Sequence, residues 1–273
     1  MKNIFKKSFV IVLAVIFAFG GVFGLGIGKV KAQVAVSFSG STFPTGPHTG
    51  ISSLDSIISG DFNTDGKQDF VSVDNASNTV SVLFGNGTGG ISPAVSVIVG
   101  IVNPSTIAVG DFNNDTKLDF VVGGKNSSKD ISVLFGNGLG GFGSPVNFSI
   151  SPTGSIFNYS PDSVTVADLN NDGKIDIVVA TNSGIFRFLN LTPTGGSIPV
   201  FGPVSPTNPF GNSIYGGGAG ARFITADDFN NDGFKDIVGT RTDQNETVVL
   251  LGDGVGGFST SYNAFPTQFF PYT

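Results

Sequence analysis

Short apolar segments alternate with polar turns along nearly the whole chain after residue 33. Each segment is three to six residues long and rich in Val, Ile and Phe, and Gly, Asn or Pro interrupts the apolar runs every few residues. Apolar runs of this length between turn residues are typical of β-strands rather than helices. The sequence therefore predicts an all-β fold without helices beyond the N-terminal segment. The expected strands are residues 34–38, 56–60, 70–73, 79–84, 95–99, 106–110, 120–122, 131–135, 146–150, 164–167, 177–180, 185–189, 223–226, 237–239, 247–251 and 259–264.

From residue 56 on, the expected strands recur in four groups of similar order. In the first, second and fourth groups an Asn-Gly or Asp-Gly pair separates the third strand from the fourth, which is the strongest short-range signal for a β-hairpin. In the third group, Asn190-Leu191-Thr192-Pro193 stands in that place. The groups repeat every 50 to 60 residues, a period typical of propeller blades. We therefore expect a β-propeller over residues 33–273, with four-stranded antiparallel blades at about 55–100, 104–151, 162–212 and 222–265.

One nine-residue stretch occurs in every group, between the first and second strands. Its pattern is D-x-N-x-D-[G/T]-x-x-D, and its copies begin at Asp61, Asp111, Asp168 and Asp228. In the EF-hand calcium loop, oxygens at positions 1, 3 and 5 converge when the chain turns tightly, and Gly at position 6 allows the turn. The present stretch keeps this order but has its closing Asp at position 9. Oxygen ligands without thiol or imidazole favour Ca²⁺ over Zn²⁺ or Cu²⁺.

Asp, Asn and Gly also form ordinary turns without a metal, so a single copy is weak evidence for a site. Four copies with one oxygen pattern favour cation binding, because three carboxylates in a short loop repel one another without a cation. The second loop departs from the pattern. Thr116 replaces Gly at position 6, where a β-branched residue is poorly compatible with positive φ. We expect weaker or distorted binding in that loop.

The N-terminus has a separate pattern. Three lysines among residues 1–7 precede an apolar run from about residue 9 to 27, and Val30-Lys31-Ala32 follows it. A basic start, an apolar middle and a small residue at the end are features of a secretory signal peptide. We predict a signal peptide over residues 1–32 and a protein that is secreted or at the cell surface. The alternative is an uncleaved membrane anchor, since the run is near the length that spans a bilayer.

Charge and composition argue against several functions. Loss of residues 1–32 removes five of the 14 basic residues and no acidic residue, so the formal charge changes from −6 to −11. Phosphates repel so acidic a chain, and nucleic acid is not an expected partner. The chain has no Cys, and its one histidine, His48, lies in a Pro/Gly-flanked segment. With neither a thiolate nor an evident general base, we do not expect an enzyme.

The strands and loops together resemble the FG-GAP/VCBS repeat family. The Asp-rich loop between the first two strands, and the segments LFGNG at 83–87 and 134–138 and LLGDG at 250–254, look like the repeats of this family. The resemblance covers roughly residues 55–265. It implies a β-propeller with Ca²⁺ in the blade loops, as in integrin α subunits and many secreted bacterial proteins, and a role in extracellular recognition or adhesion.

The resemblance also implies a ligand set for every loop. Positions 1, 3, 5 and 9 would supply side-chain oxygens, and position 7 would supply a backbone carbonyl. The implied side-chain ligands are Asp61, Asn63, Asp65, Asp69, Asp111, Asn113, Asp115, Asp119, Asp168, Asn170, Asp172, Asp176, Asp228, Asn230, Asp232 and Asp236. The implied carbonyl ligands belong to Lys67, Lys117, Lys174 and Phe234.

The number of blades leaves two interpretations open. Propellers of this family usually have more than four blades, although four-bladed propellers exist. Either four blades close, with residues 34–38 completing the last sheet, or the repeats are part of a larger, incomplete propeller, which the sequence slightly favours. An open end would leave an apolar sheet face and an unpaired strand edge exposed.

The position of the loops suggests where a partner binds. Because strands alternate in direction, the Asp-rich loops and the Asn-Gly hairpins are expected on one rim. The opposite rim carries loops of variable length and chemistry, which on a rigid scaffold usually provide recognition. We therefore expect a structural role for Ca²⁺ and an extracellular protein or glycan ligand on the opposite rim. Candidate contact residues are Tyr159, Tyr215, Arg222 and Arg241.

The predicted function is thus a secreted, calcium-binding recognition or adhesion module. A lectin-like carbohydrate binder is an alternative, although four Tyr and no Trp supply no repeated aromatic pocket. The non-catalytic part of a secreted hydrolase is another. Glycosidase chemistry needs two carboxylates, and nearly all clustered carboxylates already have loop roles. Asp227, beside Asp228, is the one acid near a loop without a predicted metal role.

Overall fold

The computed structural model of the chain describes residues 54–125, 130–150, 160–181, 184–202, 221–241, 245–259 and 263–266. The chain divides into two units, Met1–Ser41 and Thr42–Thr273, and all described residues lie in the second. The predicted signal peptide and the strand expected at residues 34–38 lie outside the described residues. Within the described part, no helix is long and apolar enough to cross a membrane.

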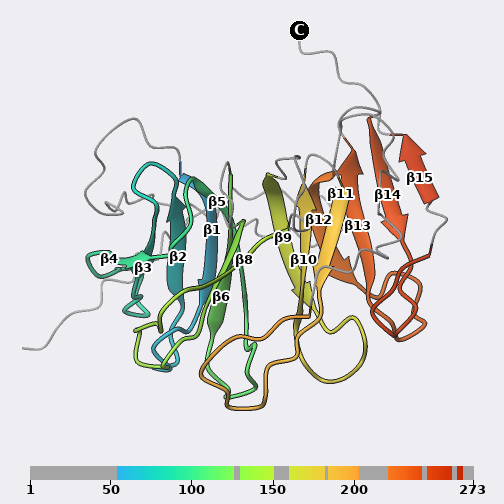
Figure 1. Cartoon of the computed structure of the whole chain (residues 1–273). Coiled ribbons are helices and arrows are strands. Elements are labelled where there is room, and N and C mark those ends of the chain that lie inside the picture. Colours follow the sequence, from blue (N-terminus) through green and yellow to red (C-terminus); the bar gives the residue numbers. More distant parts are fainter. Residues whose placement is uncertain are drawn as a thin grey trace, which may run out of the picture. The chain divides into compact units, whose positions relative to one another are not determined.

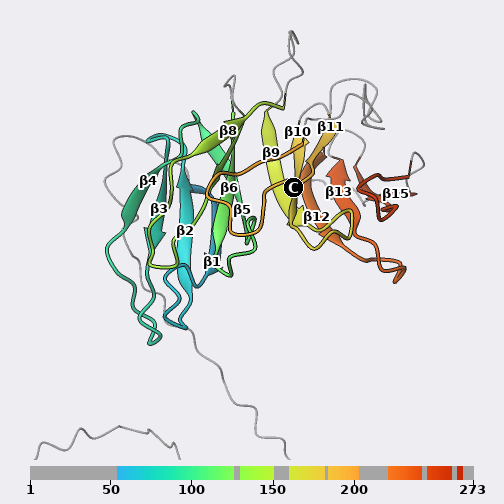
Figure 2. The same ribbon diagram turned by 60° about the horizontal axis from the view of Figure 1, so that its bottom comes forward.

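The described part contains fifteen strands in four antiparallel sheets (Figures 1 and 2). The strands are β1 (Leu54–Gly60), β2 (Asp69–Asp74), β3 (Thr79–Leu83), β4 (Val95–Ile98), β5 (Pro104–Gly110), β6 (Asp119–Gly124), β7 (Ile131–Leu134), β8 (Val146–Phe148), β9 (Pro161–Ala167), β10 (Asp176–Thr181), β11 (Gly184–Phe188), β12 (Ala221–Asp227), β13 (Asp236–Arg241), β14 (Glu246–Leu250) and β15 (Asn263–Pro266).

Each sheet is a meander of strands that are consecutive in the sequence. Sheets 1, 2 and 4 have the orders β1-β2-β3-β4, β5-β6-β7-β8 and β12-β13-β14-β15, and sheet 3 contains β9, β10 and β11. Neighbouring strands pair antiparallel throughout. The predicted all-β fold of repeated antiparallel sheets is confirmed, and every strand expected from residue 56 onward has a counterpart.

The ends of the sheets add one feature and differ from the prediction in one place. Ile91, Phe142 and Phe258 form isolated bridges with Gly85, Gly136 and Gly252 ahead of the fourth strands. The last strand is Asn263–Pro266, later than the predicted 259–264. The Ser259 amide donates to the carbonyl of Leu251 and so keeps this residue in the hairpin arm. Because β14 already pairs with β15, sheet 4 has four strands without residues 34–38.

The sheets pack face to face in chain order. The first strands of successive sheets, β1, β5, β9 and β12, lie against one another, as the two views show (Figures 1 and 2). Alternate residues of a strand point to opposite faces, so β6 sends Phe120 and Val122 toward sheet 1 and Val121 toward sheet 3. Three hydrophobic cores fill the three spaces between the sheets. Among the described strands, no packing of this kind joins β12 to β1.

The core between sheets 2 and 3 provides a test of this packing. Phe112 is buried and its ring meets that of Phe201 edge-on, with ring centroids 5.9 Å apart. Phe112→Ala should lower the free energy of unfolding in urea by about 3–5 kcal/mol, because it leaves a cavity. Leu139→Ala is the control, since Leu139 is exposed, and its effect should stay within about 0.5 kcal/mol. Equal effects of the two substitutions would contradict the packing.

Candidate metal-binding loops

The four Asp-rich loops occupy the same place in their sheets. Each follows the first strand of its sheet, and position 9 is the first residue of the second strand. Positions 4 and 6 have left-handed backbone in all four copies. Asn or Thr occupies position 4, and Gly or Thr occupies position 6, which suits the preference of Gly and Asn for this conformation. The φ angles are 55° at Thr64, 78° at Gly66, 55° at Asn114, 68° at Thr116, 56° at Asn171, 80° at Gly173, 61° at Asn231 and 88° at Gly233.

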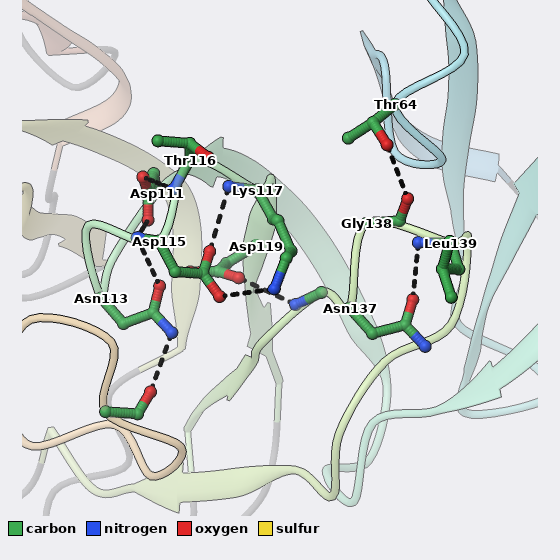
Figure 3. Close-up of polar contacts among 12 residues, drawn as sticks. Thr64, Asp111, Asn113, Asp115, Thr116, Lys117, Asp119, Asn137, Gly138 and Leu139 are labelled. Atoms are coloured by element: carbon green, nitrogen blue, oxygen red, sulfur yellow. Dashed lines mark hydrogen bonds and ion pairs between the residues drawn. The ribbon is translucent and has the colours of Figure 1, made fainter.

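The side chains of positions 1, 3 and 5 turn inward onto the amides of their own loop. The position-1 carboxylate accepts from the amides of positions 5 and 6, as Asp111 does from Asp115 and Thr116 at 3.0 and 2.7 Å. The position-3 Asn accepts from the position-5 amide, and the position-5 Asp from the position-7 amide. The other three loops repeat the same bonds. Figure 3 shows this arrangement in the second loop.

The carboxylate at position 9 has a different environment. It is buried in every copy, and both of its oxygens accept backbone N–H groups. One donor is the position-2 amide and the other is an amide of the hairpin after the third strand. Asp69 accepts from Phe62 at 2.9 Å and from Gly85 at 2.9 Å. The corresponding donors are Phe112 and Gly136 for Asp119, Leu169 and Asn190 for Asp176, and Phe229 and Gly252 for Asp236.

This carboxylate therefore joins the Asp-rich loop to the hairpin, and it places both on one rim of the sheet, as predicted. Burial raises the pKa of Asp119 to about 7 and that of Asp176 to about 6, while the two amide donors act in the opposite direction. Among the described residues, no three acidic or histidine side chains converge into a metal-binding cluster. The side chains at positions 1, 3 and 5 accept hydrogen bonds from amides of their own loop, and the position-9 carboxylate is buried at the base of the loop.

The residues at position 7 differ in charge. The ammonium groups of Lys67 and Lys117 lie 2.8 and 3.2 Å from the position-5 carboxylates of Asp65 and Asp115. The Lys67 hydrogen bond holds the pKa of Asp65 below its usual value. The fourth loop has Phe234 at this position. In the fourth loop, the position-5 carboxylate therefore has no lysine at position 7 to pair with.

Sequence reasoning missed a role of position 2, which connects each loop to the next sheet. The carbonyl of Phe62 accepts from the Gly140 amide, and the carbonyl of Leu169 accepts from the Gly256 amide. In the irregular third hairpin, the side chain of Asn190 donates to the carbonyl of Phe112 at 2.8 Å. The apolar side chain at position 2 of each of these three loops is also buried in a core between sheets. The recurrence of a large apolar residue at position 2 was the available signal.

The residues proposed to contact a partner are only partly described. Tyr159 and Tyr215 lie outside the described residues, and for Arg241 only the backbone is described. Arg222 is exposed near the start of β12. Asp227, the acid without a loop role, pairs with Lys235 at 3.0 Å, and this bond lowers the pKa of Asp227.

Comparisons with known proteins agree with the repeat pattern. The FG-GAP-like repeat family matches residues 61–122 and 111–179, and these matches confirm the predicted resemblance to this family. No curated protein matches the sequence.

The comparison with solved structures found two similar chains. One is an Agrocybe aegerita lectin described as recognising non-reducing terminal N-acetylglucosamine, with 23% identity, 76% of this chain and 50% of that chain covered, and a TM-score of 0.49. The other is BBS1N in complex with ARL6DN, with 14% identity, 76% and 56% covered, and a TM-score of 0.43. The chain spans about half the length of these structures.

The left-handed position 6 yields a reciprocal test. Thr116→Gly should raise the free energy of unfolding in EDTA by about 1 kcal/mol, because it relieves a β-branched residue at positive φ. Gly173→Thr should lower the free energy of unfolding by a similar amount, since a Cβ at Gly173 meets open space and only the backbone conformation is unfavourable. Urea unfolding measures both. If both substitutions changed the free energy of unfolding in the same direction, the backbone conformation at position 6 would not be the cause.

The buried carboxylate at position 9 yields a second test. Asp69→Asn replaces one acceptor oxygen with an amide that cannot accept from a backbone N–H, so one buried donor is left unsatisfied. The free energy of unfolding in EDTA should fall by about 1–3 kcal/mol. The control is Asp65→Asn, because an exposed position-5 Asn still accepts from the Lys67 amide. If Asp65→Asn cost as much as Asp69→Asn, the buried bonds would not be the cause.

Proposed function

We propose that the chain is a secreted, calcium-binding recognition module, in which Ca²⁺ at the Asp-rich loops stabilises a β-propeller-type scaffold. The observation that carries this proposal is the repetition of one loop conformation. All four stretches adopt the same left-handed positions and the same inward-facing oxygens. A turn alone needs no third Asp, and three carboxylates in one short loop oppose one another electrostatically.

The donor set fits a hard divalent cation. Each loop offers two carboxylates and an amide oxygen at positions 1, 3 and 5, a backbone carbonyl at position 7 and a buried carboxylate at position 9. Ca²⁺ takes six to eight oxygen ligands, and flexible carboxylates accommodate it better than they accommodate Mg²⁺. A bound cation would stabilise the ionised form of the carboxylates of the loop.

The proposed partner surface is the rim opposite the loops. On that rim the turns after the second strands meet the connections between sheets, as where Asn78 accepts from the Asn103 amide at 2.8 Å. Lys125 and Asp162 form an ion pair at 3.5 Å across two sheets on the same rim. Residues of different chemistry thus lie on a rigid support, a common arrangement for recognition. An extracellular protein or glycan is the proposed ligand, and no catalytic role is proposed.

A calcium titration tests the metal part of the proposal. Ca²⁺ should raise the melting temperature relative to EDTA, and Mg²⁺ should raise it less. A site with a dissociation constant of about 10⁻⁴ M contributes about 1.4 kcal/mol at roughly millimolar Ca²⁺, so four sites contribute about 5–6 kcal/mol. Asp172→Asn should reduce the calorimetric stoichiometry by one site while keeping the bond to the Lys174 amide.

Asp253→Asn is the matched control for the titration. Asp253 lies in the last hairpin, outside the four loops, and accepts from two hairpin amides. Its replacement should leave the stoichiometry unchanged. A melting temperature that is the same in EDTA and Ca²⁺ would refute calcium binding and leave the loops as turns. A screen of glycans and extracellular proteins against the calcium-loaded chain then tests recognition separately.

A further inference from the structure

The two outer sheets carry the two unpaired halves of an interface that recurs three times inside the chain. Within the chain, the position-2 side chain of one sheet fits against the next sheet, and its carbonyl accepts a hydrogen bond from the hairpin there. Phe62 is 1% exposed, Phe112 1% and Leu169 2%. The equivalent residue of the fourth loop, Phe229, is 47% exposed. We call the Phe229 side chain and its carbonyl the plug.

No sheet among the described residues covers Phe229, and its loop is not distorted. Its amide donates to Asp236 at 3.0 Å, as the amides of the other position-2 residues do to their own position-9 carboxylates. The loop also has the same left-handed positions as the other three loops. Sheet 4 exposes two further aromatic side chains, those of Phe223 and Phe265.

Sheet 1 carries the complementary half of the interface. Ile57 is 66% exposed and Phe70 is 36% exposed, whereas their equivalents in sheet 2, Ile107 and Phe120, are buried against sheet 1. In front of these two residues lies a cavity of about 690 Å³. We call this cavity the socket, and its lining includes Ile57, Phe70, Gly85, Gly89 and Ile91.

The socket corresponds to the space that the position-2 side chain fills in the other sheets. In sheet 2 the equivalent of Ile91 is Phe142, whose ring lies 6.0 Å from the ring of Phe62. Gly140 and Gly256, the equivalents of Gly89, donate their amides to the position-2 carbonyl of the preceding sheet. A Cβ at Gly140 would clash with Phe84 of that sheet, whereas nothing lies within 4 Å of a Cβ at Gly89. Gly89 is therefore equivalent to the glycines that contact the preceding sheet, but no described residue contacts it from that side.

We propose that the plug of one copy docks into the socket of a second copy. The two surfaces are complementary because they repeat the two sides of the three internal interfaces. They lie on the first and last sheets, and the described strands of these sheets do not pack on each other within one copy. Two copies would form both contacts at once and close a ring of eight sheets, a number within the usual range for propellers. A head-to-tail contact of this kind otherwise forms open chains.

Sedimentation velocity of the full chain in Ca²⁺, over about a hundredfold range of concentration, tests the proposal. The wild-type chain should form a two-copy species. Phe229→Asp and Ile57→Asp should each raise its dissociation constant by about a thousandfold, because either change removes both contacts of the ring. Leu139→Asp is the control, since Leu139 is exposed in the hairpin after β7 and does not line the socket, and it should leave the two-copy species intact.

A mixing experiment separates this contact from other associations. The Phe229→Asp chain keeps its socket and the Ile57→Asp chain keeps its plug, so an equal mixture should form a one-to-one complex through a single contact. Neither variant should do so alone. A cooperative urea-unfolding transition in each variant would show that both variants fold.

Three results would overturn the proposal. The first is a wild-type chain that remains a single copy at the highest concentration, in which case its own chain or further repeats cover the two surfaces. The second is a two-copy species that survives both substitutions. The third is growth beyond two copies, which excludes the closed ring.

Discussion

The buried carboxylate at position 9 is the interaction on which the rest of each repeat depends. Its two oxygens accept from the amide that opens the Asp-rich loop and from the amide of the hairpin after the third strand, in all four sheets. An ionisable group is costly to bury unless it is hydrogen-bonded, so this site accepts little else. The bonds fix the loop and the hairpin on one rim, and they aim the position-2 residue at the next sheet.

A second constraint follows from sheets that are apolar on both faces. Such a sheet is stable in water only when each face is covered, and the internal sheets cover one another through three cores. The first and last sheets have apolar residues at the same repeat positions as the internal sheets. Their outer faces are therefore suited to contact a further sheet, which the described strands do not supply. The exposure of Phe229 and Ile57 is therefore a property of the repeat and not an irregularity of two residues.

Local patterns in the sequence predicted the elements and the loop, because short apolar runs and turn residues determine both at close range. The Asn-Gly hairpins and the positive φ at Thr116 are of this kind. The role of Asp69 was not predictable in the same way, since its partner Gly85 lies sixteen residues away and the alternative role as a metal ligand uses the same side chain. The irregular third hairpin shows the same limit. Asn190 takes over the contact to the preceding sheet with its side-chain amide, which no local rule indicates.

A cation bound at the Asp-rich loops would be coupled to sheet packing, because its ligands and the packing contacts would belong to the same nine residues. Position 2 contributes its amide to the buried carboxylate, its carbonyl to the next hairpin and its side chain to the core between sheets. Ordering of positions 1, 3 and 5 by a cation would therefore restrict the same backbone that holds two sheets together. In a repeat array, stability is approximately the sum of the repeats and their nearest-neighbour interfaces. A cation at each loop would then stabilise the interfaces as well as the loops, and its effect on unfolding would exceed its local contribution.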